Sequence, residues 1–362
     1  MQIKKLFLLK AKMMRYYLKT RLVYLSFAVA LIFTACNNSP KKVDVSNIPV
    51  DVKIERFDRD FDSLRIKPMA QQAAFLQQKY GVFYIDFIEK ILKAGAVNDT
   101  SYFKTLREVF AGKAYMDLKH DVDSVYKNLD TQDAELTDAF RRIKYYFPQK
   151  RLPRVYAYFS GFQAQTSIGN GYYGIGLDLF LGRNSRFYPA LIENFPMYIS
   201  RRFTPENIAP RVLEGIARED MFPETDGGDQ TLLAKMIYNG KIMYFMDKTL
   251  PDVADSTKIG YTTKQEAWCR DYKAEIWSFF LEENLLYDSD FQKIQRYLNE
   301  APFTPGLGQD NEAAPKLAVW TGWQIVRQYM EKHPDVTLAQ LMAEKDAQKI
   351  LNAAKYRPKR EE

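Results

Sequence analysis

The chain has 362 residues and a formal net charge of +7, from 52 Lys and Arg residues against 45 Asp and Glu residues. Seven basic residues and no acidic ones precede Cys36, so the remainder of the chain is neutral and gives no electrostatic reason to expect a nucleic-acid partner. With only two cysteines and two histidines, the sequence also excludes a disulfide framework and a histidine-rich metal centre.

The first 35 residues are expected to be a signal peptide. A basic region comes first, and the apolar run from Leu22 to Ala35 is shorter than the roughly 20 residues that a membrane-spanning helix needs. The run ends in F-T-A-C, which is typical of bacterial lipoproteins, although Phe33 stands where leucine is usual. We expect Cys36 to carry a lipid such as palmitate and to anchor the protein to a membrane of the cell envelope, facing the periplasm.

The rest of the chain is expected to form one folded domain. Residues 36–47 are polar and are predicted to be a tether, residues 48–355 a single globular domain, and residues 356–362 a tail. No Pro-, Gly- or Ser-rich linker divides the domain, and 14% of all residues are aromatic, which is ample for a large core.

The first part of the domain is predicted to contain one strand followed by helices. V-D-V-K-I-E-R-F at 50–57 alternates apolar and charged residues, as a half-buried strand does. Apolar residues then recur at helical spacing. The expected helices lie at 69–94 with a break near Gly81, at 101–110, at 122–129 and at 131–147.

The central stretch from Arg154 to Asp220 is predicted to contain two strands and a helix. R-V-Y-A-Y-F-S alternates β-forming residues, and a glycine-rich turn leads to a second strand, I-G-L-D-L-F-L-G at 175–182. The segment from Thr204 to Asp220 is predicted to be a helix capped by Thr204.

Further helices dominate the remainder, so the fold class is α+β and predominantly α-helical. A small antiparallel sheet would be packed by many helices. The helices expected here lie at 230–249, 263–280, 289–299 and 316–330, with two short ones between 337 and 354 and an ordered loop at 301–314.

Two carboxylates in the central stretch are candidates for function. Asp178 lies in an apolar run, where an unpaired buried carboxylate is costly, so it either pairs with an arginine or faces a cleft. Glu214 lies on the helix that follows. The possible arginine partners of Asp178 are Arg183, Arg186, Arg201 and Arg202. The candidate binding cleft comprises Asp178, Glu214, Tyr172, Tyr173, Arg201 and Arg202, although the two tyrosines are more often hairpin packing than ligand contacts.

The familiar catalytic motifs are absent from the sequence. There is no G-x-S-x-G elbow, no phosphate-binding loop and no dinucleotide fingerprint. His120 and His333 each lack a second metal ligand at helical spacing, and Cys269 has the setting of a buried structural thiol. The sequence therefore predicts no catalytic residue, no metal and no cofactor.

Several motifs, in order along the chain, resemble the gliding motility-associated lipoprotein GldB family of Bacteroidetes. They are the F-T-A-C lipobox, D-V-K-I-E-R-F-D, G-Y-Y-G-I-G-L-D-L-F-L-G, F-T-P-E-N-I-A-P-R, M-I-Y-x-G-K-I-M-Y-F-M-D and A-V-W-T-G-W-Q-I-V. The resemblance implies a membrane lipoprotein with no established enzymatic activity, which would bind protein partners in a gliding or cell-envelope complex.

A more distant similarity is to zinc-dependent peptidases of the zincin class. Their H-E-x-x-H motif would fall on 213–217, where Glu214 is retained but Leu213 and Ala217 replace both histidines. On this interpretation the architecture is that of a zincin-like pseudoenzyme. The alternative hypothesis is a degenerate or carboxylate-based hydrolase that uses Asp178 and Glu214.

Overall fold

The computed structural model describes residues 42–224, 227–308 and 312–359. It separates into one unit that ends at Asp44 and a second from Val45 to Glu362, and the elements below belong to the second unit. The predicted signal peptide and Cys36 lie outside the described residues. No helix in the described part of the chain is long and apolar enough to cross a bilayer.

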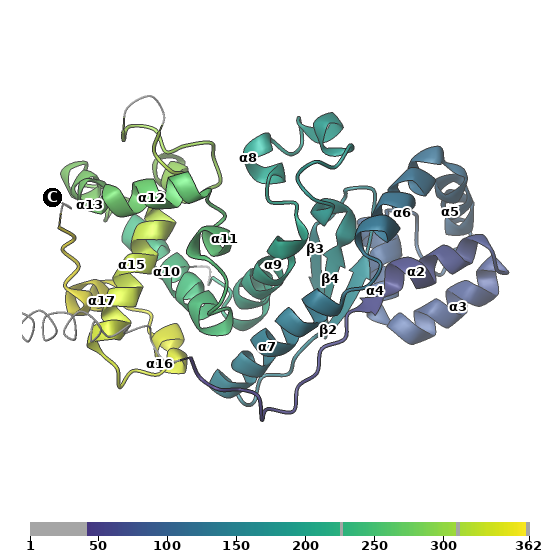
Figure 1. Cartoon of the computed structure of the whole chain (residues 1–362), viewed down its shortest axis with the longest axis horizontal. Helices are drawn as coiled ribbons and strands as arrows, with labels where there is room; N and C mark the ends of the chain where they lie inside the picture. Colours follow the sequence, from purple (N-terminus) through teal and green to yellow (C-terminus); the bar gives the residue numbers. More distant parts are fainter. Residues whose placement is uncertain (1–41, 225–226, 309–311, 360–362) are drawn as a thin grey trace, which may run out of the picture. The chain divides into compact units, whose positions relative to one another are not determined.

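Helices make up most of the first part of the fold (Figure 1). Buried aromatic rings form the core between them. The ring of Phe57 lies at the centre of this core, 4.8 Å from the rings of both Tyr80 and Phe83. Gly81, with φ of +55°, separates two helices where the sequence predicts a break. The elements are β1 (Glu55–Arg56), α2 (Phe57–Asp62), η1 (Ser63–Arg65), α3 (Met69–Tyr80), α4 (Val82–Asp86), η2 (Phe87–Ile91), α5 (Tyr102–Ala111), α6 (Lys113–Val125) and α7 (Asp130–Tyr146).

The sheet has four short strands in the order β1-β2-β4-β3, with β2 (Arg154–Tyr158), β3 (Thr166–Gly169) and β4 (Tyr172–Gly176). The prediction of an antiparallel sheet is wrong for most of it, because β1 pairs with β2 and β2 pairs with β4 in parallel. Only β3 and β4 are antiparallel. The chain leaves β2, forms β3 at the edge and turns back at Gly171, which inserts β4 between β2 and β3 and so makes β4 parallel to β2.

The predicted second strand at 175–182 is also corrected. Strand β4 ends at Gly176, and Asp178 lies in the following 3₁₀ helix η3 (Leu177–Phe180), in which all four residues are buried. A continuous apolar run is compatible with either a buried strand or a buried helical turn, so its pattern does not distinguish them.

The remaining elements are helical, and Figure 1 shows α9 beside the strands, with α10 and α15 packed together further along the chain. They are η4 (Tyr188–Leu191), α8 (Met197–Ser200), η5 (Pro205–Asn207), α9 (Ile208–Gly215), η6 (Ile216–Met221), α10 (Leu232–Thr249), α11 (Asp255–Ile259), α12 (Thr263–Asp271), α13 (Lys273–Glu282), α14 (Phe291–Ile294), η7 (Gln295–Tyr297), α15 (Leu317–Lys332), α16 (Leu338–Ala343) and α17 (Ala347–Ala354). The prediction of a predominantly helical α+β fold is confirmed.

Two glycines allow α10 and α15 to approach each other closely. A Cβ atom on Gly322 would lie 1.9 Å from the carbonyl oxygen of Met236, and one on Gly240 would lie 2.3 Å from the carbonyl oxygen of Gly322. The backbones of the two helices are therefore in direct contact. Gly240 lowers helix propensity, as the sequence suggests, but its lack of a side chain is what permits this packing.

The substitution Gly322→Ala is expected to destabilise the protein by about 3 kcal/mol, since the added methyl group can be accommodated only if the two helix backbones move apart. Urea denaturation followed by circular dichroism measures this loss. The control is Gln324→Ala on the same helix, where the side chain is partly exposed and a change within about 0.5 kcal/mol is expected. Equal stabilities for the two variants would contradict the proposed role of the close contact.

Candidate functional site

The six residues of the predicted cleft do not all lie together in the structure. Tyr172 and Tyr173 lie on β4, and the hydroxyl of Tyr172 donates a hydrogen bond to Oδ2 of Asp86 at 2.6 Å. These two tyrosines and Asp86 line a cavity of about 230 Å³. Glu214 lines another cavity, whereas Asp178 lies behind the loop that lines a third. The six residues therefore do not form the single cleft that the sequence suggests.

Asp178 is fully buried and is held by backbone amides. The N–H groups of Ser160 and Phe162 donate to its Oδ2 at 3.0 and 2.7 Å. The prediction that an arginine neutralises Asp178 is wrong, because no described arginine forms an ion pair with it. Three of its four possible partners bind elsewhere: Arg186 pairs with Asp121, Arg202 pairs with Glu300, and Arg201 donates to the carbonyl of Gly260.

The carboxylate of Asp178 fixes the shape of the loop after β2. Gly161 and Phe162 in this loop have φ values of +71° and +66°, and the second is unusual for a residue with a side chain. The hydrogen bond to Asp178 offsets the cost of that backbone conformation. The loop lines a mostly apolar cavity of about 530 Å³, together with Phe61, Leu92, Tyr115, Leu118, Phe159 and Phe187. Asp178 thus supports a cavity wall.

Tyr173 joins the sheet to α9. Its hydroxyl donates to the carbonyl oxygen of Arg211 at 3.2 Å. On the same helix, a Cβ atom on Gly215 would lie 2.2 Å from that hydroxyl oxygen. Glycine at position 215 therefore allows α9 to lie close against β4, and this contact sets where the neighbouring Glu214 lies.

Glu214 is bound by two arginines of its own helical segment. Nη1 of Arg211 donates to its Oε2 at 2.8 Å, and Nε of Arg218 donates to its Oε1 at 2.9 Å. Burial alone would raise the pKa of Glu214, but the charges of Arg218 and Arg211 lower it to about 2. The carboxylate is therefore ionised at neutral pH and both of its oxygens accept hydrogen bonds.

These three residues lie in the wall of a cavity of about 300 Å³. The wall of the same cavity also contains Glu300, after η7, and Lys316, which is the residue immediately before α15. Nζ of Lys316 contacts Oε1 of Glu300 at 2.6 Å, and Arg202 contacts the same oxygen at 3.0 Å from behind. Each carboxylate of this cavity is thus shared by two cations.

Sequence reasoning missed Glu300 and Lys316 as site residues. Neither belongs to a motif, and they follow Glu214 by 86 and 102 positions in the sequence. Arg211 and Arg218 could have been found, since their spacing of three and four residues from Glu214 places all three on one helix face. That Glu300 and Lys316 line the same cavity as these three residues depends on the tertiary fold.

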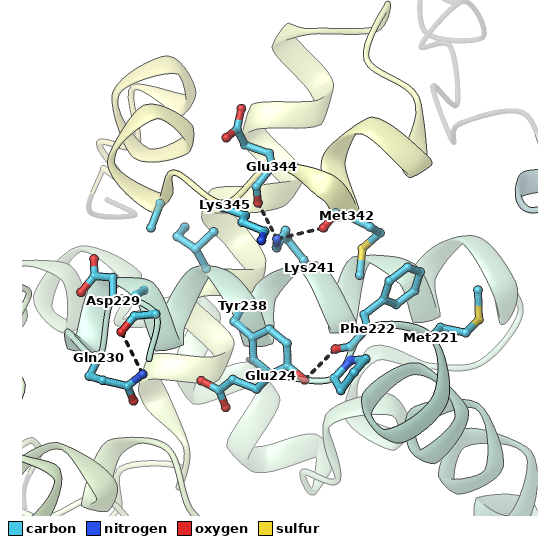
Figure 2. Close-up of a pocket in the computed structure, with 15 residues that line it drawn as sticks. Met221, Phe222, Glu224, Asp229, Gln230, Tyr238, Lys241, Met342, Glu344 and Lys345 are labelled. Atoms are coloured by element: carbon cyan, nitrogen blue, oxygen red, sulfur yellow. Dashed lines mark hydrogen bonds between the residues drawn. The ribbon is translucent and has the colours of Figure 1, made fainter. Parts of the chain in front are cut away.

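A further cavity, of about 400 Å³, is shown in Figure 2. Nζ of Lys241 donates to the carbonyl oxygens of Met342 at 3.3 Å and Glu344 at 2.7 Å, at the end of α16. The hydroxyl of Tyr238 donates to the carbonyl oxygen of Phe222 at 3.1 Å. Both groups donate hydrogen bonds to backbone carbonyls, so their role is to stabilise the fold. Burial lowers the pKa of Lys241.

The described residues contain no group of three or more His, Cys, Asp and Glu side chains placed to hold a metal ion. The two positions that would carry the zincin histidines, Leu213 and Ala217, are buried in the apolar core.

Comparison with known proteins gives one match. A family model described as gliding motility protein GldB matches residues 38–358. No curated protein and no solved structure matches the chain.

Asp178 is expected to make stability depend on pH. Burial raises its pKa to about 6 although the amides of Phe162 and Ser160 oppose the shift, whereas an unfolded aspartate has a pKa of about 3.9. The folded state therefore binds the proton more tightly, and this contribution to stability is complete below pH 4 and is lost as the pH rises through about 6.

The variant Asp178→Asn lacks this titration. The free energy of unfolding of the native protein, relative to that of the variant, should fall by as much as about 3 kcal/mol between pH 4 and pH 6 and then level off. Urea denaturation of both proteins at several pH values measures the difference, in which the other titrating groups cancel. A difference that is constant over this range would contradict the raised pKa.

Proposed function

Because the chain belongs to the family of gliding motility protein GldB, we propose that it is a lipid-anchored protein of the cell envelope that acts by binding protein partners and performs no catalysis. Gliding motility is the function of the family. The membrane anchor would be the lipid on Cys36, and the folded domain would face the periplasm. The partners would belong to a gliding or envelope complex.

The observation that carries the non-catalytic part of this proposal is the state of Glu214. A general base must be free to accept a proton and needs a pKa near the working pH. Glu214 has both oxygens bound by arginines and a pKa lowered to about 2. Leu213 and Ala217, on either side of it in the zincin pattern, have no side chain that binds zinc.

The purified full-length protein is expected to bind no stoichiometric zinc and to leave casein uncleaved. Equilibrium dialysis with zinc and a fluorescent casein assay measure the two properties. The alternative hypothesis of a hydrolase predicts cleavage that is lost in Glu214→Gln and kept in Glu219→Gln, an exposed glutamate of the same helical segment. That pattern would refute the non-catalytic role.

The substitution Cys36→Ala is expected to release the protein from membranes, because the lipid would be the anchor. Fractionation of the native cells, with immunodetection of the protein in the membrane and soluble fractions, tests this. The control is Cys269→Ala, which removes the buried thiol and should leave the protein with the membranes. Retention of the Cys36→Ala protein in the membrane fraction would refute the lipid anchor.

Protein binding itself is tested by crosslinking in native cells, followed by purification of the full-length protein. We expect the same partner proteins to be recovered with wild type and with Glu219→Gln. Recovery of no protein above the level of an untagged strain would count against the proposed mode of action.

A further inference from the structure

We propose that the cavity between α9, α11 and the start of α15 is a binding site for an oxyanion, a carboxylate or phosphate group. The inference goes beyond membrane anchoring and partner binding, and it holds even if those are wrong, since a free anion can fill the cavity. It rests on the residues around Glu214 and Glu300, and four observations support it.

The first observation is an excess of positive charge. Lys258 also lines the cavity, but together with Arg327 it is matched by Asp247 and Asp255, so that group is neutral. Among the described residues, this leaves two carboxylates in the cavity wall, Glu214 and Glu300, and four cations that pair with them, Arg202, Arg211, Arg218 and Lys316. A network that only tied the fold together would be better balanced, because partly buried unpaired charge is costly. One bound oxyanion reduces the excess.

The second observation is that these cations have donors to spare. A guanidinium group has five N–H donors. In the described structure Arg211 uses one of them on Glu214, and Arg218 likewise donates one to the same carboxylate. The free N–H groups of two neighbouring arginines suit the paired oxygens of a carboxylate or phosphate.

The third observation is an unsatisfied donor behind Glu300. Nε of Arg202 is buried and has no hydrogen-bond partner among the described residues, although its Nη1 contacts Glu300. A buried polar group without a partner calls for an explanation. Here it shows that the cluster holds fewer acceptors than its donors require.

The fourth observation concerns Lys316. It adopts a left-handed backbone conformation, with φ of +54°, and places its side chain in the cavity wall next to the N-terminus of α15. That helix has 16 residues, and no side chain in the described part of the chain caps its first turn. The positive end of the helix dipole therefore adds to the charge of Lys316 and favours an anion at the same place.

The surroundings of Arg202 are built to hold it in position. A Cβ atom on Gly260 would lie 2.0 Å from Nη1 of Arg202, so a side chain at position 260 would displace this guanidinium. Nζ of Lys316 donates to the carbonyl of Ile259, one residue earlier. The cationic side chains are thus positioned by backbone contacts before any ligand binds, which lowers the entropy cost of binding.

The experiment uses the full-length protein purified in detergent, with inorganic phosphate and glutarate as probes and sodium chloride at the same ionic strength as the reference. Isothermal titration calorimetry should show saturable binding of at least one probe. The variant Arg218→Gln should weaken that binding about tenfold or more. Arg270→Gln, which removes an exposed arginine paired with Glu266 elsewhere, should bind as wild type does.

Arg211→Gln provides a second test in case Arg218→Gln does not fold, since Arg211 is the more exposed of the two arginines. It should also weaken binding. Circular dichroism and the melting temperature confirm that each variant is folded before its affinity is compared.

The source of the oxyanion is resolved by crosslinking in native cells. If a partner protein supplies a carboxylate, Arg218→Gln should lose that partner and Arg270→Gln should keep it, even where the free probes bind weakly. If the ligand is a free anion, the probes bind and the set of partners is unchanged. The proposal is overturned if neither probe binds more tightly than chloride and the folded variants recover the same partners as wild type.

Discussion

The close packing of α9 on β4 is the contact on which the candidate site depends. Gly215 leaves room for the Tyr173 hydroxyl, and that hydroxyl bonds the backbone of the same helix at Arg211. One side of the helical segment is thereby fixed to the sheet. The same segment carries Glu214 and its two arginines, which line one cavity with Glu300 and the start of α15. A side chain at position 215 would therefore disturb both the contact of the helix with Tyr173 and the position of Glu214.

Charge is distributed in two different ways around the two central carboxylates. Asp178 forms no ion pair with a described residue and accepts hydrogen bonds from backbone amides, so burial dominates and its pKa rises to about 6. Glu214 lies between two arginines, so attraction outweighs burial and its pKa falls to about 2. The carboxylate of Asp178 therefore supports a loop, whereas that of Glu214 neutralises arginines.

The sequence predicts the helices well and the site poorly, for physical reasons. Helical periodicity is local, so the break at Gly81 and the class of the fold follow from the pattern. The parallel pairing of β2 with β4 arises because β4 lies between β2 and β3, and no local pattern encodes this strand order. No described arginine pairs with Asp178, and backbone amides donate instead to one oxygen of its carboxylate, Oδ2. Glu300 and Lys316 line the same cavity as Glu214 only because of the tertiary packing.

A pair of carboxylates with well-separated pKa values is what an acid–base enzyme uses, and Asp178 and Glu214 have such values. The geometry does not bring them to one substrate. Glu214 faces the charged cavity, whereas Asp178 is fully buried behind Ser160 and Phe162, whose loop lines a different, apolar cavity. An acid must be within hydrogen-bond reach of the proton it transfers. The separation of pKa values here arises from two unrelated structural tasks, which supports a binding role for the charged cavity over hydrolysis.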